Sequence, residues 1–315
     1  MGRARSGAWC QVRLDSPHCR FRGPAADDTA PTPTRPRRRR HRGPAARRHP
    51  PRRAAVRTFA VADVSRPSPG FARVTLLSTG DGFEEEFEPL GHDHWFRLFL
   101  PAPDGSLDLP FGPAEGWYSR LLKIDGERRP VVRNYTMREV RRAGRAWEVD
   151  VDFVVHRSPA TGEVEGTAAR WALAARPGDP VGLLDQGRLF NMDDHTGPVL
   201  VVADESGLPG VEGIARSLAG APAEYVLEVP DPADRRPLAD ADPVWLVRGP
   251  GEDVGGRALE HLSSAAITPE TGVYIVGEAS FVLAARAIAL KAGVPKGRVQ
   301  FCAYWRIGRR TEDRD

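Results

Sequence analysis

The sequence predicts two folded domains in series: an antiparallel β-barrel of six short strands, then a doubly wound parallel sheet. Short β-rich segments follow one another from residue 59 to about residue 186, with one helical segment among them. From residue 197 onward, continuous apolar strands alternate with helical segments. An Arg- and Pro-rich stretch without hydrophobic period precedes both. We expect domains over residues 56–192 and 193–315.

The strands of the first domain are marked by β-branched and aromatic residues between Pro, Gly and Asp turns. They are expected over residues 59–64, 71–77, 95–100, 131–140, 147–156 and 180–184. An Ala-rich helix is expected over residues 167–176, because this segment opens with Gly-Thr and ends before Pro177-Gly178.

The second domain shows the alternation that is typical of a parallel sheet. Its strands are expected over residues 198–203, 223–229, 244–247, 272–276 and 298–304. Its helices are expected over residues 208–218, 257–263 and 279–292, and the boundary between the domains falls near residues 191–197.

The charge of the chain is divided unevenly along the sequence. The 315 residues contain 45 Lys and Arg and 42 Asp and Glu, a net charge of +3. Sixteen Arg and three Asp lie before residue 58, which leaves 29 basic and 39 acidic residues after it. The folded part is therefore acidic, which argues against a nucleic-acid-binding surface.

Residues 1–55 have three interpretations. A disordered tail is the simplest, because the segment has too few apolar residues to offset its ordering entropy. A basic arm for nucleic acid or acidic lipid is a second. The third is a mis-assigned start, with translation beginning near Val56, since 42 Arg against 3 Lys indicate a GC-rich coding sequence.

Cysteine and histidine usage excludes several site classes. Cys302 is the one Cys after residue 57, which argues against a disulfide scaffold, a Cys-rich zinc site or a Cys-ligated cluster. The His residues lack ligand spacing, so no protein-bound metal is expected. No apolar run reaches about 18 residues and no secretory signal is evident, so we expect a cytoplasmic protein without a membrane span.

Arg133, Tyr135 and Thr136 form the first candidate binding element. On a strand, Arg133 and Tyr135 share one face and Thr136 points to the other. A guanidinium, an aromatic ring and a hydroxyl suit a ligand with a phosphate and a flat ring. The alternative is an exposed strand face with a cross-strand ion pair.

The helix that begins at Thr167 and Ala168 is a second candidate. The free N–H groups of a helix start attract anions, and small residues let a phosphate approach. The alternative is a Thr N-cap without a ligand.

Three further candidates lie where strands of the second domain end. In an open α/β sheet, ligands bind at the carboxyl ends of the strands. Turns or aromatic packing are the alternatives, and dinucleotide-binding, Walker and nucleophile-elbow motifs are not present. The candidates are Asp204-Glu205-Ser206, Gly277-Glu278-Ala279 and Tyr304-Trp305.

Taken in order, these pieces resemble the siderophore-interacting protein family, the flavin-dependent ferric reductases within the ferredoxin–NADP reductase superfamily. The resemblance covers nearly everything after Val56. Two mild departures are Ser206-Gly207, where the family often has Thr-Ala, and Ala303, where it often has Gly. The matching stretches are 133–138, 152–156, 168–171, 176–179, 203–209, 244–248, 277–279 and 304–308.

The resemblance implies an FAD-binding barrel and an NAD(P)H-binding α/β domain, with no catalytic side chain beyond the flavin. Arg133 would hold the FAD diphosphate, Tyr135 would pack on the flavin ring and Thr136 would lie near its N5. His156, Thr167 and Ala168 would reach the phosphates or adenosine. The other cofactor-binding positions would be Asp152, Trp171, Asp204, Glu205, Ser206, Gly277, Glu278, Ala279, Tyr304 and Trp305.

The same resemblance implies that electrons pass from NAD(P)H through FAD to a ferric siderophore, which releases Fe(II). Arg97, Arg138 and Arg248 would attract the anionic substrate. Arg235 and Arg236 favour NADPH slightly over NADH, and ferredoxin is a possible donor. A reductase for another acceptor and a non-catalytic siderophore-binding protein are the alternatives, and a monomer is expected.

Overall fold

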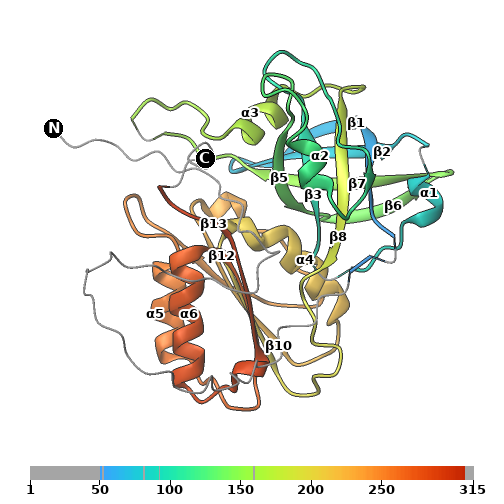
Figure 1. The fold of residues 1–315 in the computed structure, drawn as a ribbon. Helices are drawn as coiled ribbons and strands as arrows, with labels where there is room; N and C mark the ends of the chain where they lie inside the picture. Colours follow the sequence, from blue (N-terminus) through green and yellow to red (C-terminus); the bar gives the residue numbers. More distant parts are fainter. Residues whose placement is uncertain (1–49, 52, 81, 92, 159, 309–315) are drawn as a thin grey trace, which may run out of the picture.

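The chain forms two sheets that stand one above the other in Figure 1. The computed structural model describes residues 50–308, apart from residues 52, 81, 92 and 159. Most of the Arg-rich segment 1–55 lies outside the described residues, and its three interpretations stay predictions. None of the helices in the described part is long and apolar enough to cross a membrane.

Eight strands within the described residues form the first sheet, which is antiparallel and barrel-like. Their order is β5-β3-β8-β1-β2-β7-β6, with β4 paired to β1. Three helices accompany them: α1 (Phe83–Glu86), α2 (Trp117–Leu121) and α3 (Thr167–Ala174). The strands are β1 (Ala55–Ser68), β2 (Phe71–Ser78), β3 (His94–Leu100), β4 (Gly112–Pro113), β5 (Val131–Thr136), β6 (Glu139–Ala143), β7 (Ala146–Val154) and β8 (Pro180–Arg188).

The predicted barrel is confirmed, but its strands are divided more finely than the six expected. The segment 131–140 was expected as one strand, and the structure splits it at Met137-Arg138 into β5 and β6. These two strands lie at opposite ends of the strand order although two residues separate them. The chain therefore steps from one edge of the sheet to the other, which requires the sheet to curl into an open barrel.

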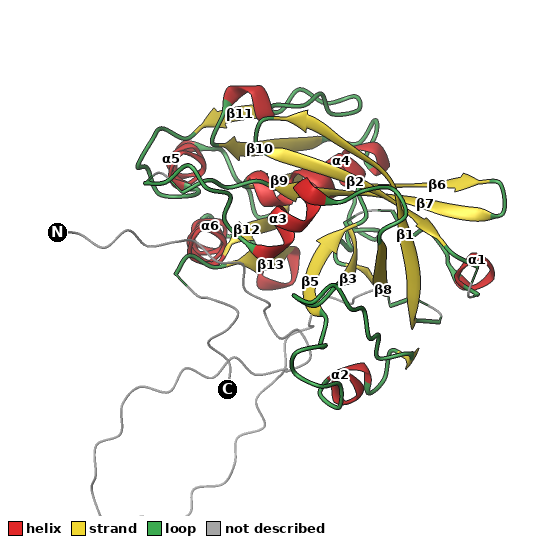
Figure 2. Ribbon diagram, turned by 90° about the horizontal axis from the view of Figure 1, so that it is seen from above, coloured by secondary structure: helices red, strands yellow, loops and turns green. Residues whose placement is uncertain are grey.

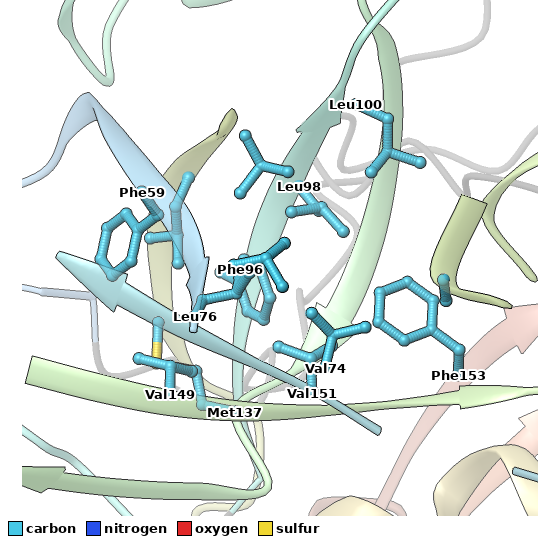
Figure 3. Close-up of a cluster of buried hydrophobic side chains, with 14 of the residues drawn as sticks. Phe59, Val74, Leu76, Phe96, Leu98, Leu100, Met137, Val149, Val151 and Phe153 are labelled. Atoms are coloured by element: carbon cyan, nitrogen blue, oxygen red, sulfur yellow. The ribbon is translucent and has the colours of Figure 1, made fainter. Parts of the chain in front are cut away.

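Alternating side chains of the curled sheet fill the barrel (Figure 3). Val149, Val151 and Phe153 of β7 point inward, and their side chains are fully buried. Phe96 and Leu98 of β3 meet them from the other side of the core. Every second residue of these strands therefore belongs to the barrel core, as expected when successive side chains of a strand point to opposite faces.

The second sheet is parallel and doubly wound, as predicted. Its strand order is β11-β10-β9-β12-β13, and its helices are α4 (Leu208–Ser217), α5 (Gly256–Ser264) and α6 (Ala279–Lys291). Figure 2 shows helices on both faces of this sheet. The strands are β9 (Val199–Ala203), β10 (Ala223–Val229), β11 (Val244–Val247), β12 (Gly272–Glu278) and β13 (Val299–Trp305).

The two faces of the parallel sheet pack against different partners. Val201 of β9 belongs to a cluster with α4, whereas Val202 packs with α5 and α6. Phe71 and Val154 of the barrel join the α4 cluster, so the two domains share one apolar core. Helix α4 thus lies on the side of the sheet that faces the barrel (Figure 1).

The strand order of the parallel sheet reverses between β9 and β12. The chain proceeds outward through β10 and β11 on one side and through β12 and β13 on the other. Such a reversal opens a crevice at the carboxyl ends of the two central strands. This crevice positions the candidate site.

Candidate functional site

A cleft lies between the barrel and the carboxyl ends of the parallel strands. Its walls are mainly apolar, with a few amide, hydroxyl and carboxylate groups among them. Such a surface suits a flat, largely apolar ring whose polar edge needs hydrogen-bond partners. The lining residues are Trp95, Asn134, Tyr135, Thr136, Asp152, Val154, Leu189, Ser206, Pro209, Cys302, Ala303 and Tyr304.

Five predicted site residues line this cleft. They come from both domains and from distant parts of the sequence, which supports the expectation that they belong to one site. Asn134, Val154 and Pro209 of the cleft wall lie within the motif stretches but were given no role, whereas Trp95, Leu189 and Cys302 lie outside them. The five are Tyr135, Thr136, Asp152, Ser206 and Tyr304.

Tyr135 is held by a row of aromatic rings that extends into the barrel. The centroid of its ring lies 4.4 Å from that of Phe153 on β7. The ring centroid of Trp171 on α3 lies 5.7 Å from that of Phe153. Burial raises the pKa of Tyr135, so its hydroxyl stays protonated. Arg133 does not line the cleft, and its Nη1 donates to the Val132 carbonyl oxygen.

The predicted anion site at the start of α3 is an exposed helix start. Gly166 occupies the N-cap position and makes no side-chain cap hydrogen bond, so the alternative of a Thr167 N-cap is wrong. Thr167 is exposed and Ala168 is buried against the barrel. The phosphate-binding role of this helix start stays a prediction.

Asp93 lies beneath the cleft and was not singled out from the sequence. Its carboxylate accepts hydrogen bonds from Thr136 Oγ1 at 3.0 Å and from the hydroxyls of Tyr274 and Tyr304. Burial raises the pKa of Asp93, although these three donors oppose the shift. Its donors lie 43, 181 and 211 residues away, so no local pattern could have revealed it.

Asp204 organises the carboxyl ends of β9, β12 and β13. Its side chain accepts from the backbone N–H groups of Ser206 at 2.9 Å and Glu278 at 2.7 Å, and from Trp305 Nε1 at 3.0 Å. Burial and the charge of Glu205 raise the pKa of Asp204 to about 7. Gly277 must be glycine, because its φ is +139° and a Cβ would lie 2.6 Å from Asp204.

Two helix starts near Asp204 are occupied by carboxylates of the chain itself. Glu278 caps α6, where its Oε2 accepts from the N–H groups of Ser280 and Phe281, so Ala279 begins a self-capped helix. Glu228 accepts from Gly255 N at 2.6 Å and Ala258 N at 3.1 Å at the start of α5. These helix starts are therefore already neutralised.

Arg248 lies in a buried ion-pair network instead of facing solvent. It contacts Glu205 at 2.9 Å and Glu228 at 2.9 Å, and 9% of its side chain is exposed. Burial opposes its charge, but the two carboxylates outweigh this effect and raise the pKa of Arg248. The structure thus pairs Arg248 with two buried carboxylates, and its role in substrate binding stays a prediction.

His156 lies beside this network. Its Nε2 is 3.8 Å from Glu205, and its ring centroid is 5.6 Å from that of Trp305. Burial lowers the pKa of His156, and the charge of Glu205 offsets only part of this shift. His156 is therefore neutral at pH 7.

Arg97 and Arg138 are also held by neighbours. The Arg97 guanidinium lies 4.6 Å from the Trp117 ring centroid and 5.4 Å from that of Trp95. Arg138 pairs with Glu212 at 2.6 Å and Glu139 at 2.8 Å. Roles for these two cations in substrate binding stay predictions.

Arg236 does not have the free guanidinium that a 2′-phosphate would need. It pairs with Glu212 at 2.9 Å and with Asp152 at 2.5 Å, while Arg235 is exposed. Burial disfavours the Asp152 charge, but Arg73 and Arg236 outweigh it and lower the pKa of Asp152. Among the described residues, no group of three or more His, Cys, Asp or Glu side chains could hold a metal ion.

The chain resembles reductases of known name. The ferric vibriobactin reductase ViuB of Vibrio cholerae is 28% identical over 257 residues, which is 78% of this chain and 87% of the relative. The NADPH-dependent ferric-chelate reductase of Escherichia coli is 33% identical over 159 residues, or 49% of this chain and 54% of the relative.

Solved structures share the fold. The siderophore-interacting protein SipS from Aeromonas hydrophila superposes with a TM-score of 0.60 at 24% identity, covering 80% of this chain and 98% of that chain. A siderophore utilization protein from T. fusca gives a TM-score of 0.62 at 23% identity, with 85% and 97% covered.

Two family models divide the chain between the two sheets. The siderophore-interacting FAD-binding domain matches residues 60–189, which contain most of the barrel. The siderophore-interacting protein model matches residues 197–308, which contain the parallel sheet. The chain therefore belongs to the siderophore-interacting protein family.

Proposed function

We propose that this protein is a flavin-dependent ferric-siderophore reductase, which passes electrons from NAD(P)H through FAD to Fe(III) and releases Fe(II). The observation that carries the proposal is an apolar cleft between an FAD-binding barrel and a doubly wound sheet. The relative from Vibrio cholerae, named a ferric vibriobactin reductase and similar over 87% of its length, supports the substrate class.

The cleft fits a flavin ring. Val154, Leu189 and Pro209 offer apolar walls, and Asn134 and Ser206 offer polar groups at the rim. Trp95 lines the cleft, and its buried Nε1 has no hydrogen-bond partner within the described part of the chain. A buried donor without a partner is costly, so an acceptor on a bound ring would stabilise it.

FAD is proposed over FMN because two separate elements could bind phosphate. Arg133 lies on β5 with Tyr135, and Thr167 begins α3, which carries Trp171; the rings of Tyr135 and Trp171 both neighbour that of Phe153. A diphosphate with an adenosine could use both elements, whereas FMN carries one phosphate.

Bound FAD supplies hydride acceptance and single-electron transfer, so the chain needs no acid, base or metal for the chemical step. The side chains of this chain hold the ring and set the distance to the substrates. Val154, Leu189 and Pro209 would shield the face of the bound ring from water, and Tyr304 lines the cleft from the second domain.

Anaerobic visible spectroscopy of the purified protein tests the proposal. We expect a flavin spectrum that is bleached by NAD(P)H and restored by a ferric siderophore, with Fe(II) trapped by a chelator. Restoration by free flavin instead would favour a reductase for another acceptor. A protein without bound flavin would be a siderophore-binding protein. Bleaching by reduced ferredoxin alone would make that protein the donor.

NADPH is proposed as the preferred donor, with Arg235 as the remaining cation for its 2′-phosphate. Arg235 is exposed, and the relative from Escherichia coli is named an NADPH-dependent enzyme. We expect Arg235→Ala to lower kcat/KM for NADPH while kcat/KM for NADH is unchanged. Arg145→Ala, which removes an exposed cation from the β6–β7 turn, is the matched control. Equal loss with both donors would contradict the assignment.

The substrate is proposed to be anionic, with Arg97, Arg138 and Arg248 as the cations that attract it. All three already have acidic, amide or aromatic neighbours, so their combined field, more than any one contact, would attract the chelate. A monomer in the cytoplasm stays a prediction.

A further inference from the structure

Asp93 joins the two domains at the floor of the cleft. Asp93 and Thr136 belong to the barrel, whereas Tyr274 lies on β12 and Tyr304 on β13 of the parallel sheet. All three hydroxyls donate to the one carboxylate, which is 2% exposed. A buried carboxylate is costly unless it is hydrogen-bonded, so its three donors are held firmly.

The backbone around Asp93 is shaped for this arrangement. Asp93 has a φ of +53°, a left-handed conformation that few residues other than glycine adopt. Helix α4 presents Gly210 opposite the carboxyl group, and a Cβ there would lie 2.6 Å from Asp93 Oδ1. Placing this carboxylate therefore requires a strained backbone at Asp93 and a glycine at position 210 of helix α4.

Two of the three donors also line the cleft, namely Thr136 and Tyr304. A hydroxyl has one proton, and here each proton is directed at Asp93. The oxygens of both residues therefore have only lone pairs left for a bound ring. Tyr274 donates to the same carboxylate but does not line the cleft.

We propose that Asp93 is a positioning residue for the flavin: it fixes the Tyr304 ring and the Thr136 hydroxyl in the cleft and makes both oxygens acceptors toward the bound ring. The proposal rests on the flavin occupying this cleft. Asp93 does not line the cleft, so it would act on the cofactor only through Thr136 and Tyr304.

Asp93→Asn tests the proposal, because asparagine keeps the shape but exchanges one acceptor oxygen for an N–H donor. We expect FAD affinity of the apoprotein, measured by titration calorimetry, to fall roughly tenfold or more. The fluorescence decay of bound FAD should gain a slower component, since an unfixed Tyr304 ring quenches the flavin less uniformly.

Two matched variants separate positioning from general stability. Asp185→Asn alters another buried barrel carboxylate, which contacts His94 at 2.7 Å and does not line the cleft. It should lower Tm without changing FAD affinity or fluorescence decay. Gly210→Ala keeps every hydrogen-bonding group but displaces the Asp93 carboxyl group, so it should act like Asp93→Asn.

A double-mutant cycle on FAD affinity completes the test. If Asp93 acts through Tyr304, Asp93→Asn should cost less affinity in a Tyr304→Phe background than in the wild type. Additive losses, or a fall in Tm with unchanged affinity and decay, would overturn the proposal. A wild-type apoprotein that does not bind FAD would instead overturn the proposed function.

Discussion

At the scale of single residues, buried carboxylates of the same type behave in opposite ways. Asp152 is surrounded by Arg73 and Arg236, and its pKa is lowered. Burial and the charge of Glu205 raise the pKa of Asp204 to about 7, against the hydrogen bonds from backbone and indole N–H groups. Neighbouring charge, more than burial, therefore decides which carboxylate stays ionised.

Asp204 should make the protein less stable as pH rises. Its pKa of about 7 in the folded protein lies above the value of about 3.9 expected in the unfolded chain. Its contribution to the free energy of unfolding is therefore full below about pH 4 and is lost as pH rises to about 7. We expect the advantage of wild type over Asp204→Asn to shrink by on the order of 2–4 kcal/mol between pH 4.5 and pH 7.5.

Urea unfolding of both proteins across this pH range measures the effect. The lowered pKa of His156 gives stability the opposite slope near pH 6.5, but that contribution is common to both proteins and cancels in the difference. A difference that stays constant with pH would mean that Asp204 is ionised throughout.

Removal of the Arg248 charge should affect stability before it affects substrate binding. Arg248→Ala leaves Glu205 and Glu228 buried without their cation, which should lower the free energy of unfolding by about 3–5 kcal/mol. KM for an anionic ferric chelate at low salt should change little. A raised KM that recovers with salt, in a variant of normal Tm, would show that Arg248 by itself attracts the anionic chelate.

At the scale of secondary-structure elements, the helix starts near the site differ in what binds them. Glu228 and Glu278 occupy the starts of α5 and α6, whereas the start of α3 has a Gly N-cap with no side-chain cap. Among these three helices, α3 is thus the one whose first N–H groups can take a phosphate from outside.

Glu278→Ala should loosen the first turn of α6. The variant removes the acceptor of Ser280 and Phe281, and loss of an N-cap typically costs about 0.5–2 kcal/mol. Hydrogen exchange of these two amides should accelerate more than exchange in the middle of α6. Glu270→Ala, an exposed position, is the control. Equal exchange rates in wild type and variant would show that the cap is dispensable.

The elements that sequence predicted well have strong local signals. The continuous apolar run of β9 and the Ala-rich pattern of α6 fix both elements within a residue or two. The division of residues 131–140 was missed, because Met137-Arg138 contains neither Gly nor Pro. That break arises from the curl of the whole sheet, which no short segment records.

At the scale of the whole molecule, the two domains are joined by charges as well as by apolar packing. Asp152 of β7 and Glu212 of α4 both pair with Arg236, and Arg138 also pairs with Glu212. Fully buried Asp234 accepts from Gly70 N at 2.9 Å across the same interface. Relative motion of the domains would break these contacts.

Gly70→Ala should weaken the docking of the domains. A Cβ at residue 70 would lie 2.3 Å from Asp234 Oδ2, so one side of the interface must move, at a cost of about 1–3 kcal/mol. Differential scanning calorimetry should show a lower and broader transition. Gly126→Ala, which meets no atom within 4 Å, is the matched control. Identical melting of both variants would show that the interface accommodates the methyl group.

The candidate site was predictable where the motif residues themselves line the cleft. Tyr135, Thr136 and Tyr304 were found because an aromatic or hydroxyl group at a strand end has a recognisable chemistry. The carboxylate partners of Arg248 and Arg236 were not predictable, since the sequence shows a cation but not the carboxylate that will face it. Asp93 was missed because its hydroxyl donors are far away in the sequence.

The long separation between Asp93 and its donors has a consequence for biosynthesis. The barrel strands lie within residues 55–188 and emerge from the ribosome before β12 and β13, and domains generally fold in that order. A barrel that folds first still lacks Tyr274 and Tyr304, so its cleft is unfinished. We therefore expect a nascent chain to capture FAD tightly only after the last strand has docked, which makes cofactor loading a late step in maturation.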